Sequence, residues 1–128
     1  MSGLQGAADA IAGTPVLDDA LLGELEPFGA TFLVELVDTF ETQVGILVRD
    51  VHVALAAADT GALHRAAHTL KGSAASIGAS RCSAAAAAVD RAGQEGDLEG
   101  AAGVASGLAS LGSAAVAALR ARVRELPE

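Results

Sequence analysis

Apolar residues recur at steps of three and four along much of this chain, which is the repeat of one face of an α-helix. The longest run lies in residues 31–58 and consists of Phe32, Leu33, Leu36, Val37, Phe40, Val44, Leu47, Val48, Val51 and Leu55. Short segments that contain glycine interrupt the repeat near residues 59–61, 78–80 and 96–97. The sequence therefore predicts an all-α fold of several helices joined by short loops.

The composition favours the same fold. Hydrophobic residues make up 52% of the chain and aromatic residues only 2%, and alanine is the commonest apolar residue. Alanine is the strongest helix former because it loses no side-chain entropy in a helix. A chain of 128 residues is long enough for one domain with a modest core. Since short loops make successive helices antiparallel neighbours, we expect an antiparallel up-down-up-down four-helix bundle.

The N-terminal part adds one short helix to this bundle. We expect a loose leader over residues 1–15, with partial helix as the alternative, and a single domain over residues 16–128. Thr14 and Pro15 have the pattern of a helix start. This short additional helix should end before Pro27, because proline disfavours helix at the residue that precedes it.

The four helices of the bundle are expected at about residues 31–58, 62–77, 80–95 and 98–126. Glycine adopts the left-handed conformation that ends many helices, and Gly78 and Gly96 fit that position. Short polar side chains can cap the helix starts, and the candidates are Asp59 or Thr60, Ser80, and Asp97.

Charge and targeting signals exclude several classes of partner. The formal net charge is −8 and no Lys/Arg cluster is present, so neither nucleic acid nor an anionic membrane surface is an expected partner. The single cysteine, Cys82, fits a reducing compartment and a core position. The first residues lack the basic flank and apolar run of a signal peptide. We therefore expect a cytoplasmic protein, and a monomer.

One segment has the length of a membrane-spanning helix. Residues 100–119 carry no charge over 20 positions. However, they comprise eight Ala, four Gly and three Ser against three Leu and two Val, and insertion into a bilayer depends on the larger apolar residues. We interpret this segment as a buried helix of small residues.

Residues 63–78 contain the most informative pattern. On a helical wheel, Leu63, Ala66, Ala67, Leu70, Ala74 and Ile77 share an arc that should face the core. A second arc carries His64, His68, Lys71, Gly72 and Ala75. Glycine inside a helix costs about 0.5–1 kcal/mol relative to alanine, so its use in an alanine-rich chain suggests that a partner approaches the backbone there.

This second arc suits the chemistry of phosphoryl transfer. A neutral imidazole such as that of His68 is a competent nucleophile near neutral pH. Lys71, one turn away, can neutralise phosphoryl oxygens as a point charge. The sequence shows no nucleotide-binding loop and no Mg²⁺ cluster. We therefore expect a carrier without a cofactor of its own rather than an enzyme, and a partner that supplies the phosphoryl donor and Mg²⁺.

The string Ala67-His68-Thr69-Leu70-Lys71-Gly72-Ser73, followed by Ile77-Gly78-Ala79, closely resembles the signature of histidine-containing phosphotransfer domains. The resemblance implies that His68 is phosphorylated, on Nε2, and exchanges the group with receiver domains of response regulators or hybrid histidine kinases. It also implies that Lys71 and Gly72 are the supporting cation and the small neighbour, and that Ser73 and Gly78 shape the segment. His64 and Ala75 extend the expected docking surface.

Other interpretations stay open at this point. One is a related bundle that is not phosphorylated and acts as an adaptor, although intact His68, Lys71 and Gly72 argue against it. Another is the substrate domain of a chemotaxis-type histidine kinase, excised from a longer chain. His64 and His68 also have the i, i+4 spacing of helical metal ligands, but the sequence offers no third ligand, so we expect no metal site.

Overall fold

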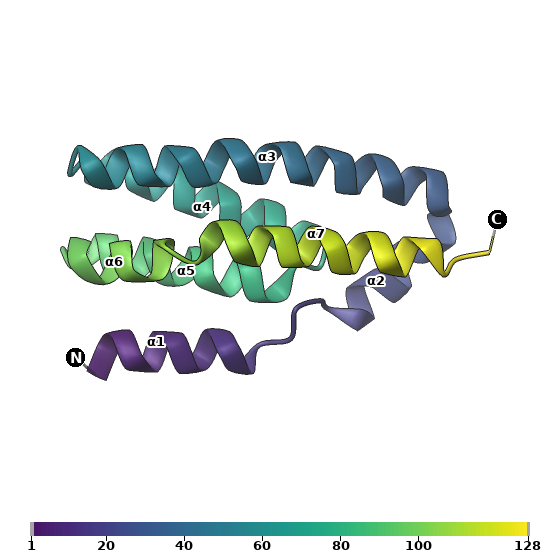
Figure 1. Cartoon of the computed structure of the whole chain (residues 1–128), viewed down its shortest axis with the longest axis horizontal. Helices are drawn as coiled ribbons and strands as arrows, with labels where there is room; N and C mark the ends of the chain where they lie inside the picture. The colour runs from purple at the N-terminus through teal and green to yellow at the C-terminus, as the bar shows by residue number, and fades with distance from the viewer. Residues whose placement is uncertain (1, 128) are drawn as a thin grey trace.

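The structure is a computed structural model that describes residues 2–127, and within that range it contains helices and no strand. In chain order the elements are α1 (Ser2–Gly13), α2 (Asp19–Leu25), the 3-10 turn η1 (Glu26–Phe28), α3 (Ala30–Ala56), α4 (Thr60–Ser76), α5 (Ser80–Gln94), α6 (Leu98–Ala105) and α7 (Leu108–Arg124). Helices α3, α4 and α5 and the α6–α7 pair run in alternating directions along the bundle axis, which is horizontal in Figure 1. The predicted all-α four-helix bundle is confirmed.

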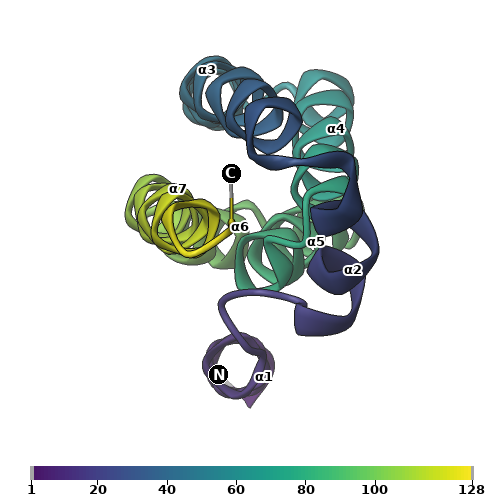
Figure 2. The same cartoon turned by 90° about the vertical axis from the view of Figure 1, so that its right-hand side faces the viewer.

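Each bundle helix packs against its neighbours around a shared centre. Helix α4 contacts α3 and α5, α5 also contacts α6 and α7, and α7 returns to α3. Figure 2 looks along the bundle and shows these helices around the core, with α1 outside them next to α5. Helix α4 is therefore packed between α3 and α5, and within residues 2–127 the side chains of His64, His68 and Lys71 remain exposed.

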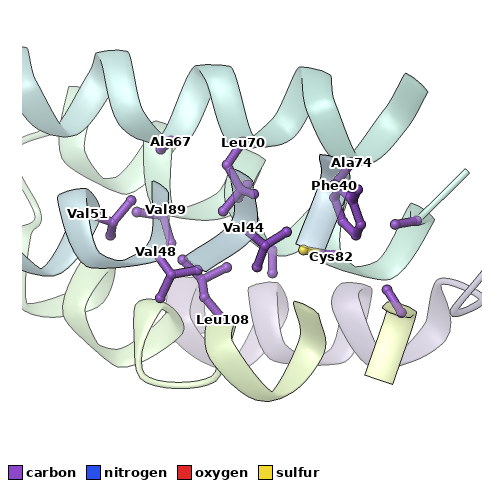
Figure 3. Packing of buried hydrophobic residues seen from close by; sticks show 14 of the residues in the cluster. Phe40, Val44, Val48, Val51, Ala67, Leu70, Ala74, Cys82, Val89 and Leu108 are labelled. Atoms are coloured by element: carbon purple, nitrogen blue, oxygen red, sulfur yellow. The ribbon is translucent and has the colours of Figure 1, made fainter. Parts of the chain in front are cut away.

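Small side chains fill the core (Figure 3). Phe40 is the one aromatic side chain buried among the described residues, and many of the other buried positions are alanine. The largest fully buried side chains are Leu63, Leu70, Leu108, Leu119, Val37, Val51, Val89 and Cys82. Because alanine and glycine add little bulk, the helices approach one another closely. A Cβ at Gly112 of α7 would lie 2.5 Å from Val44 Cγ1 of α3.

Aspartates begin three of the helices. The carboxylates of Asp18, Asp59 and Asp97 accept hydrogen bonds from backbone N–H groups in the first turns of α2, α4 and α6. Gly78 and Gly96 have φ of +78° and +79°, so both glycines end helices as predicted. The predicted cap at Ser80 is wrong: Ser80 is the first residue of α5, and the cap position is Ala79, which has no side-chain hydrogen bond.

Of the two alternatives for the N-terminal segment, a loose leader or partial helix, the structure has helix, because α1 occupies most of the segment. Ile11 packs against the core, and Arg81 of α5 donates a 2.7 Å hydrogen bond from Nε to the carbonyl oxygen of Thr14. These contacts come from distant parts of the chain, so local sequence did not reveal them. Thr14 also does not begin the next helix: its hydroxyl donates to the carbonyl of Ala10, and Asp18 caps α2.

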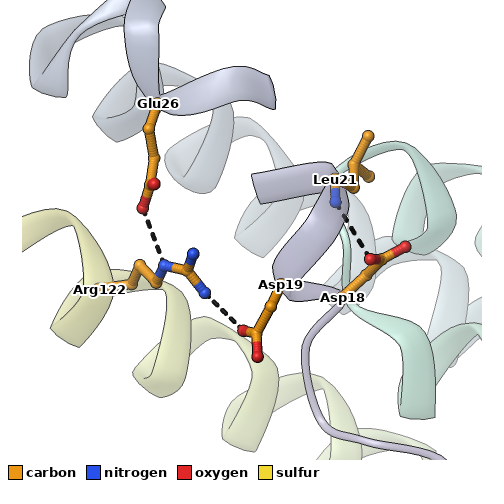
Figure 4. Close-up of polar contacts among 5 residues, drawn as sticks. All are labelled: Asp18, Asp19, Leu21, Glu26 and Arg122. Atoms are coloured by element: carbon orange, nitrogen blue, oxygen red, sulfur yellow. Dashed lines mark hydrogen bonds and ion pairs between the residues drawn. The ribbon is translucent and has the colours of Figure 1, made fainter. Parts of the chain in front are cut away.

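Arg122 holds the short helix α2 against the end of the bundle (Figure 4). Its Nε donates to Glu26 Oε2 at 2.8 Å and its Nη1 to Asp19 Oδ1 at 2.6 Å. The hydrogen bonds with these carboxylates, Glu26 first, raise the pKa of the Arg122 guanidinium. A cation near the C-terminus of α7 thereby fixes both α2 and η1.

The predicted helix over residues 98–126 is interrupted in the structure. The Ser106 hydroxyl donates to the Gly103 carbonyl at 2.7 Å, and the Gly107 N–H bonds to Val104, one residue closer than in an α-helix. Serine competes for backbone groups and glycine weakens a helix, so the break falls where the two meet. Leu98–Arg124 is the one described stretch long and apolar enough to cross a membrane, judged by length and composition alone. In the structure it packs on the bundle through residues such as Ala105, Leu108 and Leu119.

Candidate functional site

Helix α4 has two different faces, as its sequence predicts. Its inward face consists of the buried residues Leu63, Ala66, Ala67, Leu70 and Ala74. The five residues of the second arc are all exposed, and we call them the outer face of α4: His64, His68, Lys71, Gly72 and Ala75. The inward face supplies the apolar contacts by which α4 joins the core.

His68 lies near the middle of the outer face. Its imidazole is exposed and lies against the ring of His64, at a centroid separation of 5.4 Å and an interplanar angle of 30°. Lys71 and Gly72 follow one helical turn later. Beside them, the Ser83 hydroxyl of α5 donates to the Lys71 carbonyl at 2.9 Å, which ties this part of α4 to its neighbour.

Gly72 leaves the backbone next to His68 uncovered. A Cβ at this position would meet nothing within 4 Å, so no neighbour in the fold requires glycine here. Ala75 is exposed as well and adds only a methyl group. At Gly72 and Ala75 the outer face therefore carries no bulky side chain, and a partner's backbone or loop can approach it closely there.

His64 is held by α5, which the sequence did not predict. Its Nδ1 lies 2.7 Å from Oδ1 of Asp90 and 3.0 Å from Nε2 of Gln94. The Gln94 amide also donates to Asp90 Oδ1 at 3.1 Å. The only signal in the sequence was a carboxylate and an amide at i, i+4 in an alanine-rich helix. Spacing alone could not show that they face α4.

The two supporting residues lie at the C-terminal part of α4. The Ser73 carbonyl accepts a 2.9 Å hydrogen bond from the Ser76 hydroxyl. The Gly78 carbonyl accepts a 2.8 Å bond from the Asp18 N–H, and a Cβ on Gly78 would lie 3.3 Å from Leu22 Cγ. With φ at +78°, Gly78 thus closes α4 and brings α2 against its end.

Comparison with known proteins identifies the family. The Hpt domain family matches residues 35–126. This chain belongs to the Hpt domain family. A crystal structure of histidine-containing phosphotransfer protein B from Pseudomonas aeruginosa PAO1 has the same fold as this Hpt domain, with a TM-score of 0.78 and 24% identity over 88% of this chain and 98% of that chain. No curated protein matches the sequence.

The outer face of this Hpt domain is open rather than pocketed. A groove of about 420 Å³ lies between α3 and α4, lined by residues that include Val53, Arg65 and Thr69. His64 and His68 do not line it. Between residues 2 and 127, no three His, Cys, Asp or Glu side chains are grouped as metal ligands. Both histidines are exposed on the surface of α4 and are accessible from solvent.

Cys82 lies in the core of the Hpt domain and away from the outer face. It is 1% exposed, and burial raises the pKa of its thiol from 9.0 to about 11. A thiol with so high a pKa carries little thiolate at neutral pH and is a poor nucleophile. Its position agrees with the predicted core role.

Proposed function

We propose that this Hpt domain accepts a phosphoryl group on His68 from the aspartyl phosphate of one receiver domain and passes it to another. The observation that carries the proposal is the division of α4: its inward face completes the core without His68, Lys71 or Gly72. Family membership supports the same role, because Hpt domains are histidine phosphotransfer carriers of two-component phosphorelays.

The transfer step needs only one nucleophilic nitrogen from this chain. The Nε2 lone pair of neutral His68 attacks the phosphorus of the aspartyl phosphate and forms an N–P bond. The P–O bond to the receiver's carboxylate breaks, and its electron pair stays on the carboxylate oxygen. The phosphoimidazolium product can release its Nδ1 proton to solvent. The reverse sequence returns the group to a second receiver.

Lys71 and Gly72 assist this step in different ways. The Lys71 ammonium can approach the phosphoryl oxygens from one turn along the helix and balance part of their charge. Gly72 leaves room for the receiver's active-site loop, so that donor and acceptor atoms come into line. Mg²⁺ belongs to the receiver in this proposal, and the Hpt domain holds no cofactor.

The partner surface is the outer face of α4 and its immediate surroundings. Such a face suits a modest, transient contact with receiver domains of response regulators or hybrid histidine kinases in the cytoplasm. The Hpt domain acts as a monomer in this proposal, because the outer face has to remain available to successive partners.

The test is phosphotransfer from a panel of labelled receivers to the wild type and to two variants. His68→Gln removes the proposed acceptor. His52→Gln is the matched control, because His52 is also an exposed helical histidine but belongs to α3. We expect acid-labile, base-stable label on the wild type and on His52→Gln, and none on His68→Gln. Folded wild-type protein that takes label from no receiver would contradict the carrier role and favour the adaptor.

A further inference from the structure

Asp90 is the one buried charged residue in the part of the chain that the structure describes, with 8% of its surface exposed. A buried carboxylate is costly unless hydrogen bonds satisfy it. Here His64 and Gln94 both contact the same oxygen, Oδ1. The other buried positions of α5 are uncharged: Cys82, Ala85, Ala86, Ala88, Val89 and Gly93. Its clearest structural consequence is the position of the His64 ring.

The hydrogen bonds determine which nitrogen of His64 carries a proton. An ionised carboxylate only accepts, so His64 Nδ1 must be the donor to Asp90. The Gln94 amide then gives its hydrogen to Asp90 rather than to Nδ1. This assignment leaves His64 Nε2 without a hydrogen-bond partner among residues 2–127, either as a lone pair in the neutral ring or as a second N–H in the imidazolium. The side chain is 47% exposed, so solvent or a ligand can reach it.

The held ring lies beside the proposed phosphorylation site. The 5.4 Å centroid separation of His64 and His68 is short enough for a tetrahedral group on one ring to meet the other. We propose that His64 in its charged form donates from Nε2 to a phosphoryl oxygen on phospho-His68, and that Asp90 is the positioning residue that aims it. Phospho-His68 then has one cation a turn before it, His64, and another a turn after it, Lys71.

This inference rests on the proposed phosphorylation of His68 and adds a second residue that touches the phosphoryl group. The groups facing the His64 ring are Asp90 and Gln94 from α5 and His68 from its own helix. A phosphoryl dianion on His68 places a second anion beside the ring, which favours the imidazolium. Because histidine changes charge between about pH 5 and 8, the contact should weaken as pH rises.

The experiment measures the half-life of phospho-His68 after labelling with phosphoramidate, a small N–P donor that requires no receiver. Wild type, His64→Gln, His64→Lys and Asp90→Asn are compared at about pH 6.5 and about pH 8.5. His52→Gln is again the control, and circular dichroism verifies that each variant is folded. Labelling of His68→Gln, followed by peptide mapping, shows whether His64 itself takes the group.

We expect the half-life of His64→Gln to be about twofold to fivefold shorter than that of wild type at about pH 6.5, the range of an exposed charge contact. At about pH 8.5 the half-lives of wild type and His64→Gln should be equal, because His64 is then neutral. His64→Lys keeps its charge at that pH, so its half-life should be longer than that of both. Asp90→Asn should change in the same direction as His64→Gln, by less. A difference that is equal at both pH values would indicate a structural role and overturn the inference, as would equal half-lives or phosphorylation of His64.

Failure of the inference and failure of the proposed function have different signatures. If wild type accepts label and passes it to receivers but His64→Gln behaves identically, only the role of His64 is wrong. If His68 takes label from neither phosphoramidate nor any receiver, the carrier role is wrong and the role of His64 fails with it.

Discussion

Gly72 and Gly112 are both glycines inside long helices, yet their surroundings are opposite. Gly112 of α7 is buried, and a Cβ there would lie 2.5 Å from Val44 Cγ1. Gly72 of α4 is exposed, and a Cβ there would meet nothing within 4 Å. Each glycine costs about 0.5–1 kcal/mol relative to alanine. At Gly112 the close approach of α7 and α3 offsets that cost, whereas at Gly72 no contact within the fold does.

The same contrast, between small residues that pack and small residues that do not, distinguishes the two sides of the α4–α5 pair. On the inside, Gly93 of α5 allows Leu63 to approach, since a Cβ at Gly93 would lie 2.7 Å from Leu63 Cδ2. On the outside, His68 and Lys71 make no contact that the core requires. Small residues on the inside therefore serve packing. Gly72 on the outer face of α4 has no such packing role, as expected if a partner docks there.

Gly112→Ala should cause the largest loss of stability. The added methyl meets the stiff, β-branched Val44, so α7 must move away from α3 or Val44 must leave its preferred rotamer. We expect a loss of about 1–3 kcal/mol in the free energy of unfolding, measured by urea denaturation. Gly45→Ala in α3 is the matched control, because a Cβ at Gly45 meets nothing within 4 Å. A Gly112→Ala variant as stable as Gly45→Ala would break the comparison.

The burial of Cys82 inside the bundle can be tested through the pH dependence of stability. Its thiol pKa is about 11 in the folded chain because of burial, against 9.0 for an ordinary thiol. Between these values the unfolded chain has lost the proton and the folded chain keeps it, so stability falls as pH rises. By about pH 10 the loss should be about 1 kcal/mol.

The measurement compares urea denaturation of wild type and Cys82→Ala at about pH 8 and about pH 10. The alanine variant has its own packing cost, but that cost does not change with pH. The comparison therefore uses only the change in the free energy of unfolding between the two pH values. Parallel loss of stability in both proteins would mean that Cys82 is not protected by burial. Thiol alkylation offers a second readout: native protein should react slowly and unfolded protein rapidly.

Local features of the sequence predicted most of the bundle and the outer face of α4. The repeat of apolar residues at steps of three and four shows which face of a helix lies toward the core. Asp59 and Gly78 mark the ends of α4 without help from distant residues. Features that depend on distant contacts were not predicted. Helix α1 is fixed in part by Arg81, and the side of α5 that meets His64 depends on how α5 is rotated against α4. The spacing of residues in the sequence shows neither the contact of Arg81 with the N-terminal segment nor the rotation of α5 against α4.

Gly72→Ala should give the smallest change in stability and the sharpest test of the comparison. Since nothing lies within 4 Å of the added methyl, the variant should be about 0.5–1 kcal/mol more stable than wild type. Transfer from a phosphorylated receiver should nevertheless fall about tenfold or more, because the methyl displaces the docked partner. Labelling by phosphoramidate should not change, since it needs no docking. Gly45→Ala should gain similar stability and keep full transfer. If Gly72→Ala is stabilised and still transfers normally, the glycine on the outer face has no docking role, and the comparison with Gly112 shows only where the fold tolerates an extra methyl.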